Sequence, residues 1–306
     1  PCMKIAFVHP KRAFLPELAA YESFFRSKNI ETAIYRYGEE KTSNADVFWF
    51  MMGIYPGAAA KGKKVIHEYS SSSIPPYRKL KDLIKSKLNP RPDFRLYHNE
   101  YVMKQIRHMD GIPWGIRDQG VSEDFNPLPE TKKQYDFIYI GSLSAERRID
   151  RLLRVFQQPV LKDRTILLLG QDYDRLAAVF SADQNIIFSG PISRVEVPGY
   201  LSRARFAVNF IPDREPFNAQ TSTKFLEYAA MQIPIVSTEY YWLSRFQEKY
   251  RGKYFLLAED LSNLNWSRVN AFNYEFPDMR SWRWEQQLRS SGVLEFLQAA
   301  FPGITF

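Results

Sequence analysis

The sequence has very little cysteine: Cys2 is the only one among its 306 residues. A single thiol cannot form a disulfide within the chain, and a zinc site built on cysteine ligands is excluded. Long apolar runs are missing too, since no window reaches the roughly eighteen apolar residues that a membrane-spanning helix needs. The early apolar stretch Ile5–Val8 is too short for a signal peptide. We therefore expect a cytoplasmic protein, soluble or attached to a membrane from outside.

Several ligand-binding motifs are absent as well. No G-x-G-x-x-G follows the first predicted strand, where Pro10-Lys11-Arg12 stands instead, and this argues against a nicotinamide or flavin oxidoreductase. The G-K-[ST] triplet of a P-loop and the G-x-S-x-G of a serine hydrolase do not occur. No RNA- or DNA-binding motif is present either, so we expect no nucleic-acid partner.

The charge balance points to an anionic partner. Lys and Arg number 42 against 34 Asp and Glu, which gives a net charge of +8. The basic segment Tyr77–Leu88 places Leu80, Leu83 and Ile84 on one helical face, and such a helix can lie on an anionic membrane. The alternative is the solvated face of an ordinary helix beside a sheet.

Short apolar runs alternate with helical patterns along the chain. In the first half, strands are predicted at Lys4–Val8, Glu31–Tyr35, Val47–Met51, Lys64–His67, Phe94–Tyr97 and Pro113–Ile116. After the Pro- and charge-rich segment 126–133 the pattern restarts, with strands at Asp136–Ile140, Thr165–Leu169, Asn185–Phe188, Phe206–Phe210 and Pro234–Val236. This alternation predicts an α/β protein with two doubly wound, Rossmann-like parallel sheets. Such sheets bind ligands beyond the carboxyl ends of their strands.

The segment from Phe206 to Thr238 carries the most chemical information. A predicted strand leads through a polar loop into a helix that begins at Thr221–Thr223, whose hydroxyls suit helix capping. Free amides at a helix start attract phosphate, and Lys224 adds a positive charge there. Glu227 shares a face with Lys224, and its carboxylate can accept hydrogen bonds from both ribose hydroxyls. The pair predicts a nucleoside diphosphate site, whereas an isolated pair of this spacing is an ordinary surface ion pair.

The run T-S-T-K-F-L-E-Y-A-A-M-Q-I-P-I-V-S-T, at 221–238, resembles the donor-site signature of GT-B-fold glycosyltransferases similar to glycosyltransferase family 4. The segment 136–153 is similar to the strand, glycine loop and helix that open their C-terminal domain, and 186–210 to their next strand and base-side loop. The resemblance covers about Asp136 to Trp242. It implies a GT-B fold, in which two Rossmann-like domains face a central cleft.

The resemblance also implies roles for individual residues. They are Lys224 and Arg147 for the donor diphosphate, Glu227 for the ribose, Ser222, Thr223 and Thr221 for the distal phosphate, Gly141 for the loop before Arg147, and Ile192 for the base. No metal or other cofactor is implied, since lysine, arginine and helix amides neutralise the diphosphate. The chain departs from the family pattern at Ala219, where many relatives carry a glutamate. That departure leaves the sugar and the stereochemical outcome open.

The first half resembles these enzymes more weakly. The segment 64–87 is similar to the strand and histidine that face the donor sugar, which places His67 at the cleft against sugar or acceptor. His9, at the end of the first predicted strand, is the second candidate for a catalytic residue. We expect residues 1–127 to form the acceptor-side domain and 128–277 the nucleotide-sugar-binding domain. Residues 278–306, with a helix predicted over Asp278–Ala300, cross back onto the first domain by the same resemblance.

The resemblance implies transfer of a sugar from a nucleoside diphosphate sugar to a hydroxyl of a glycan or lipid-linked acceptor. A cytoplasmic enzyme, peripheral on the inner face of the membrane, fits such an acceptor. Two alternatives stay open: an inactive nucleotide-sugar-binding protein, and a sugar epimerase of the same fold. The D-x-D at Asp172–Asp174 raises a third, a metal-dependent transferase, although Asp172 also suits a helix N-cap.

Overall fold

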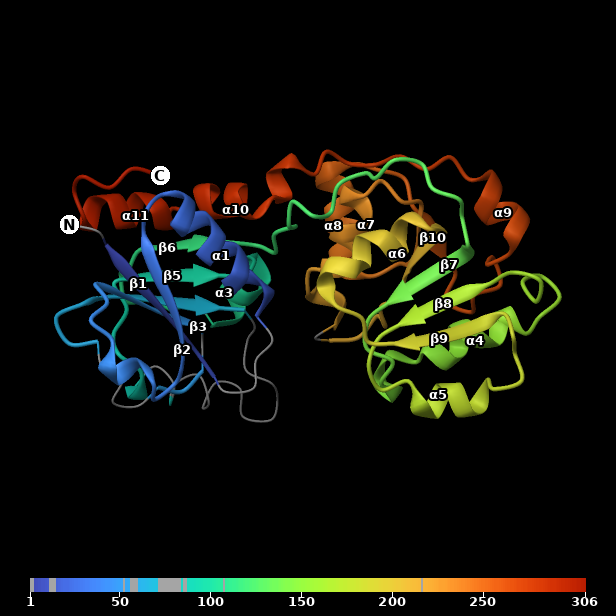
Figure 1. The fold of residues 1–306 in the computed structure, drawn as a ribbon, viewed down its shortest axis with the longest axis horizontal. Helices are drawn as coiled ribbons and strands as arrows, with labels where there is room; N and C mark the ends of the chain where they lie inside the picture. Colours follow the sequence, from blue (N-terminus) through green and yellow to red (C-terminus); the bar gives the residue numbers. More distant parts are fainter. Residues whose placement is uncertain are drawn as a thin grey trace. The chain divides into compact units, whose positions relative to one another are not determined.

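The computed structural model describes residues 3–10, 15–51, 53–55, 60–70, 84, 87–106, 108–215 and 217–306. The chain divides into two compact units (Figure 1), one formed by Pro1–Gly120 with Ser281–Phe306 and the other by Val121–Arg280. Most of the predicted basic helix Tyr77–Leu88 lies outside the described residues. Within the described ranges, no helix is both long enough and apolar enough to cross a membrane.

The first unit is built on a six-stranded parallel sheet in the order β2-β1-β3-β4-β5-β6. Its strands are β1 (Lys4–His9), β2 (Glu31–Arg36), β3 (Val47–Met51), β4 (Lys64–Tyr69), β5 (Phe94–Tyr97) and β6 (Trp114–Ile116). Its helices are α1 (Pro16–Ser27), α3 (Glu100–Ile106), α10 (Trp284–Ser290) and α11 (Val293–Ala300), with the short 3-10 turn η1 (Glu40–Thr42). All of β3 is buried, as a continuous apolar run in a sheet covered on both faces requires.

The C-terminal segment packs on the first unit, where α10 and α11 share a hydrophobic core with α1 and the sheet (Figure 1). The prediction of one long helix over Asp278–Ala300 is wrong. The segment consists of η5 (Arg280–Trp282), α10 and α11. Gly292 interrupts the helical conformation between α10 and α11: its φ of 76° is not helical, and glycine adopts such a φ readily. At this break the Ser291 carbonyl lies against Gly115, where a Cβ atom would be only 1.7 Å from the Ser291 oxygen.

The second unit has a six-stranded parallel sheet in the order β12-β11-β10-β7-β8-β9. Its strands are β7 (Tyr135–Ile140), β8 (Ile166–Leu169), β9 (Ile186–Gly190), β10 (Ala204–Asn209), β11 (Ile235–Thr238) and β12 (Phe255–Leu257). Its helices are α4 (Ile149–Phe156), α5 (Asp174–Val179), α6 (Val197–Ser202), α7 (Thr223–Ala230), α8 (Tyr241–Tyr250) and α9 (Trp266–Ala271), with 3-10 turns η2 (Ala145–Arg147), η3 (Arg194–Glu196) and η4 (Phe217–Ala219). Numbered within the unit, the strand order is 3-2-1-4-5-6, that of the dinucleotide-binding Rossmann fold.

The helices of the second unit cover both faces of its sheet. The hydrophobic core on one face joins α4, α5 and α9 to alternate residues of the strands, and Figure 1 shows α4 and α5 on the opposite side of this sheet from α7 and α8. The unit begins at Val121, before the predicted boundary at 127/128. Val121 and Phe125 are both buried, and Phe125 packs under the guanidinium of Arg194, so this stretch belongs to the second unit.

Candidate functional site

The carboxyl edge of the second sheet gathers the residues that the sequence singled out. Strand order reverses between β7 and β10, so the loops after these two strands diverge and leave a site between them. Glycines lie at the ends of three neighbouring strands at this edge: Gly141 follows β7, Gly170 follows β8, and Gly190 is the last residue of β9. A Cβ atom on Gly170 would lie 1.8 Å from the Gly141 carbonyl oxygen, and Gly190 has a φ of 69°. These glycines let the backbone of adjacent loops approach closely.

The start of α7 is fixed to the ends of two strands. The Ser222 hydroxyl accepts a hydrogen bond from the Phe225 amide (3.2 Å) and donates one to the Oδ1 atom of Asn209 (2.8 Å). The Nδ2 group of buried Asn209 donates in turn to the Ser237 hydroxyl (2.8 Å) and to the Tyr240 hydroxyl (3.1 Å). The predicted cap is confirmed, and it orients the free amides of α7 at the edge between β10 and β11.

Lys224 and Glu227 form an ion pair of 2.7 Å between Nζ and Oε2 on the first turns of α7. Glu227 is only 2% exposed, whereas Lys224 keeps 28% of its side-chain surface exposed. The other oxygen of Glu227, Oε1, lies 3.1 Å from the Nη2 atom of Arg194. The geometry of this second contact falls short of a hydrogen bond, so Oε1 is buried with unused acceptor capacity. A buried carboxylate between two cations is not an ordinary surface pair.

Arg147 reaches the same cluster from the loop after β7. Its guanidinium lies over the Phe217 ring, 4.5 Å from the centroid. Burial raises the pKa of Tyr139 to about 12, and the nearby positive charge of Arg147 opposes that rise. Burial also raises the pKa of Tyr240, again opposed by Arg147. Because Tyr240 also contacts Asn209, the Arg147 charge lies beside the polar cluster that holds the start of α7.

The helix that follows this loop, α4, begins only at Ile149. Arg148 adopts a left-handed φ of 54° between η2 and α4, which separates the two. This break leaves Arg147 on a short turn at the sheet edge and not on the side of a continuous helix.

The remaining predicted donor residues lie at the same edge. Thr221 is buried just before the cap, Thr223 is the first residue of α7, and Ile192 is half-buried in the loop after β9. Ala219 is buried at the end of η4. The structure thus brings the loops after β7, β9 and β10 to one side of the sheet.

Two arginines of this site were missed by the sequence reasoning. Arg194 contacts Glu227, and Arg214 lies over the Phe217 ring at 5.4 Å while it donates to the Glu146 carbonyl (3.2 Å). Both stand in loops that follow strands, in the same loops as predicted residues. A search for every cation in these loops, beyond the family motif, could have found them.

The D-x-D segment does not form the predicted cap. The N-cap residue of α5 is Tyr173, which makes no side-chain cap hydrogen bond. Asp172 lies one residue earlier, has a left-handed φ of 63° and contacts Ser142. The Ser142 hydroxyl donates to Asp172 Oδ2 at 3.4 Å. In the described part of the chain, no three His, Cys, Asp or Glu side chains gather as a metal site.

In the first unit, His67 lies inside the fold. It sits within β4, is 3% exposed, and packs between the rings of Phe50 and Tyr69. Burial lowers the pKa of His67 to about 3, and the neighbouring charges of Arg95 and His108 lower it further. The imidazole is therefore neutral. Its burial does not favour a contact with sugar or acceptor, and the catalytic role of His67 stays a prediction.

His9 is better placed than His67. It ends β1, next to the position between β1 and β3 where the order of the first sheet reverses. Its ring is half-buried, and Nδ1 lies 3.0 Å from the Pro10 carbonyl oxygen. A carbonyl only accepts, so Nδ1 is the donor in this contact, and Nε2 is the ring nitrogen left for other partners.

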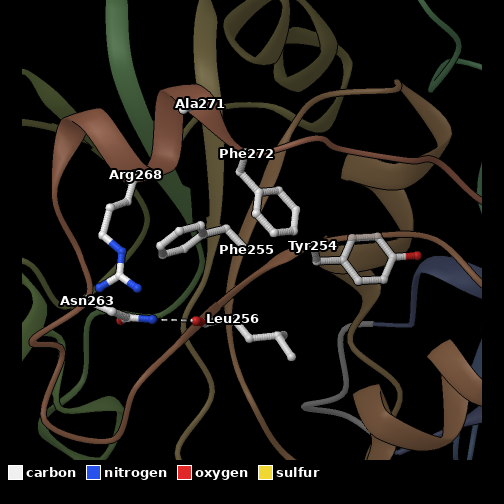
Figure 2. A pocket seen from close by; sticks show the side chains of 7 residues that line it. All are labelled: Tyr254, Phe255, Leu256, Asn263, Arg268, Ala271 and Phe272. Atoms are coloured by element: carbon white, nitrogen blue, oxygen red, sulfur yellow. Dashed lines mark hydrogen bonds between the residues drawn. The ribbon is translucent and has the colours of Figure 1, made fainter.

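The second unit has a separate open hollow beside its edge strand β12 (Figure 2). The Asn263 side chain donates to the Leu256 carbonyl (2.8 Å) and accepts from the Ala258 amide (2.8 Å), as a neighbouring parallel strand would. Arg268 supplies the charge, and the aromatic residues Tyr254, Phe255 and Phe272 line the hollow (Figure 2). This hollow shares no residue with the cluster at the carboxyl edge, and Asn263 pairs backbone groups at the sheet edge that would otherwise be open.

Comparisons with known proteins agree with this architecture. Residues 134–262 match the model of a family described as Glycosyl transferases group 1. Among solved structures, a sucrose-phosphate synthase from Thermosynechococcus elongatus is similar with a TM-score of 0.62 and 11% identity, over 97% of this chain and 100% of that one. AviGT4, a glycosyltransferase involved in avilamycin A biosynthesis, gives a TM-score of 0.59 and 12% identity, over 97% and 96% of the two chains.

A third structure, HepE of Anabaena in complex with UDP and glucose, gives a TM-score of 0.59 and 11% identity, over 88% of this chain and 89% of that one. No curated protein matches the sequence significantly. These structures share the two-sheet architecture of this chain, so the fold is GT-B, as predicted. The match to the family described as Glycosyl transferases group 1 lies in the segment 134–262, which holds the cluster at the carboxyl edge.

Proposed function

We propose that the second unit binds a nucleoside diphosphate sugar at the carboxyl edge of its sheet, and that the enzyme transfers the sugar to a hydroxyl of a glycan or lipid-linked acceptor. The observation that carries this proposal is the buried Glu227 paired with Lys224 at the capped start of α7. Lys224 is exposed enough to meet a diphosphate, and Glu227 has an oxygen free to accept from a ribose hydroxyl. The family match and the solved complex of HepE with UDP and glucose favour transfer over epimerisation or binding alone.

Negative charge grows on the departing diphosphate as the sugar leaves. Lys224, Arg147 and the amides at the start of α7 lie where they can stabilise that charge, so the proposal needs no metal ion. If EDTA abolishes release of the nucleoside diphosphate, or if Asp172→Asn does, this metal-independent mechanism is wrong.

The acceptor hydroxyl must lose a proton. A retaining enzyme can pass it to the leaving phosphate, and an inverting enzyme needs a base from the first unit. We propose His9 for that base, ahead of His67, because His9 is the more exposed and ends β1 next to the reversal of strand order. A His9→Gln variant that keeps full kcat with an inverted product would exclude this role.

We also propose that the basic segment Tyr77–Leu88 holds the enzyme on an anionic membrane surface on the cytoplasmic side. The support is the net charge of +8 and the segment's basic, amphipathic pattern. Flotation with vesicles of anionic lipid, against vesicles of neutral lipid, tests this; equal binding to both would refute it.

The donor proposal is tested by the thermal unfolding of the enzyme with UDP, GDP, TDP, CDP and ADP. A ligand at a hundred times its Kd stabilises the folded state by about 2.7 kcal/mol, which corresponds to roughly 5–10 °C in a unit of this size. We expect one of these nucleotides to produce such a shift in the wild type. Glu227→Gln and Lys224→Gln should each reduce it, because each removes a charged contact to the ligand.

The matched control is Glu248→Gln, which removes an exposed carboxylate paired with Arg245 at 3.2 Å on α8. It should leave the shift unchanged. A wild type that none of the nucleotides stabilises refutes the donor site. So does a shift that survives in both Glu227→Gln and Lys224→Gln.

A further inference from the structure

The buried Glu227 carboxylate lies between two cations from different elements. Lys224 comes from the same helix and contacts Oε2 at 2.7 Å, whereas Arg194 comes from η3 and contacts Oε1 at 3.1 Å. The neighbouring Tyr228 is fully buried, and the Glu227 charge is among the causes that raise its pKa, after burial itself. Glu227 therefore depends on these two cations for compensation of its charge.

Donor binding changes this balance. In the proposed function, on which this inference rests, the diphosphate attracts Lys224, and each contact that Lys224 makes to phosphate weakens its hold on Glu227. Because Glu227 is only 2% exposed, water contributes little to the solvation of its negative charge. Arg194 is then the cation that holds the carboxylate in place.

Two features of the fold keep Arg194 beside Glu227. The Ser193–Glu196 capping box fixes the start of η3, with the Ser193 amide donating to Glu196 Oε2 at 3.1 Å. The Arg194 guanidinium also lies over the ring of buried Phe125, 5.4 Å from its centroid. Two independent contacts, one on the backbone and one on the side chain, hold the cation beside Glu227.

We propose that Arg194 is a positioning residue that keeps Glu227 oriented toward the ribose while Lys224 contacts the diphosphate. The division of labour is one cation for each oxygen of Glu227. The site therefore selects donors with a full ribose, because the Glu227 carboxylate needs hydroxyl donors to complete its hydrogen bonding. The donor class is that of ribonucleoside, not 2′-deoxyribonucleoside, diphosphate sugars.

The test compares UDP with 2′-deoxy-UDP, or the equivalent pair for whichever base binds, by calorimetry on the full chain. In the wild type we expect the ribonucleotide to bind about ten- to a hundredfold more tightly, as for a hydrogen bond to a charged group. Arg194→Gln should reduce that ratio to about three or less. Arg194→Lys should restore most of it, because it returns the charge. A purely structural role of Arg194 would weaken both nucleotides equally and leave the ratio unchanged.

The matched control is Arg245→Gln, which removes an exposed arginine paired with Glu248 at 3.2 Å. It should keep the wild-type ratio. A wild type that binds neither nucleotide refutes the donor site itself. Binding with a ratio that Arg194→Gln leaves unchanged, or that Arg194→Lys fails to restore, overturns only the assignment of Arg194.

Discussion

A buried charge cluster in the first unit makes a sharp prediction about stability. Glu68 on β4 is 1% exposed and accepts hydrogen bonds from Tyr21 (3.1 Å), from Trp49 (2.7 Å) and from the guanidinium of Arg117. Arg117 is equally buried, and its next carboxylate, Glu17, is 3.9 Å away. The cluster joins α1, β3 and β4 to the residue that follows β6.

Glu68→Gln keeps the size of the side chain and an acceptor for Tyr21 and Trp49, but it removes the charge that faces Arg117. The guanidinium is then left in the core with Glu17 at 3.9 Å as its nearest carboxylate. Breaking a buried pair in this way costs about 3–5 kcal/mol. The control is Glu285→Gln, which breaks an exposed pair with Arg289 of 2.7 Å on α10 and should cost less than about 1 kcal/mol.

Denaturant unfolding followed by tryptophan fluorescence measures both variants, since Trp49 lies within the cluster and Trp284 has Arg117 over its ring at 5.1 Å. Arg117→Met and the double variant complete a mutant cycle. We expect the two changes together to cost about 1–3 kcal/mol less than their sum. Additive costs, or a Glu68→Gln variant as stable as the Glu285→Gln control, would refute the reasoning.

Three further predictions concern the described core and edges. Gly170→Ala should cost about 1–3 kcal/mol, because its Cβ meets the Gly141 carbonyl at 1.8 Å, and it should weaken nucleotide binding; Tm and Kd are measured together. Asn263→Leu should cost about 1–3 kcal/mol in denaturant, since two backbone groups of the edge strand lose their partner. His67 has a folded pKa of about 3 and an unfolded one of about 6.5. Only the unfolded chain therefore gains its proton between these values, and stability falls as pH drops through that window, by up to about 1.4 kcal/mol per unit. His67→Gln should flatten that fall between pH 6.5 and pH 4.5, and an unchanged slope would contradict it.

Much of the fold could be predicted because several of its strands are buried on both faces. Val47–Met51 is a continuous apolar run, and Phe94–Tyr97 is apolar except for Arg95; the structure has β3 and β5 at these bounds. The short edge strand β12, with three residues, gives no such signal and was not predicted. The break at Gly292 was also missed, because it depends on the close approach of Ser291 to Gly115 in a distant strand.

The same limit applies to the candidate site. Lys224 and Glu227 were recognisable because they share one helix face, where sequence spacing determines contact. Arg194 reaches Glu227 from a different loop, and its contact depends on the fold that brings the end of β9 beside α7. The burial of His67 depends likewise on Phe50 and Tyr69. Neither the contact of Arg194 with Glu227 nor the burial of His67 can be predicted from spacing along the sequence.

Two of the buried glutamates, Glu68 and Glu227, differ in how their oxygens are used. Glu68 uses both oxygens for hydrogen bonds from the protein, so its cluster is complete without any ligand. Glu227 is about as buried, yet among the described residues its Oε1 has no aligned donor, and the guanidinium of Arg194 lies 3.1 Å away. Burying such a charge at the edge of a sheet destabilises the fold relative to an apolar residue. In the proposed function, the ribose hydroxyls supply the hydrogen-bond donors that Oε1 lacks among the described residues.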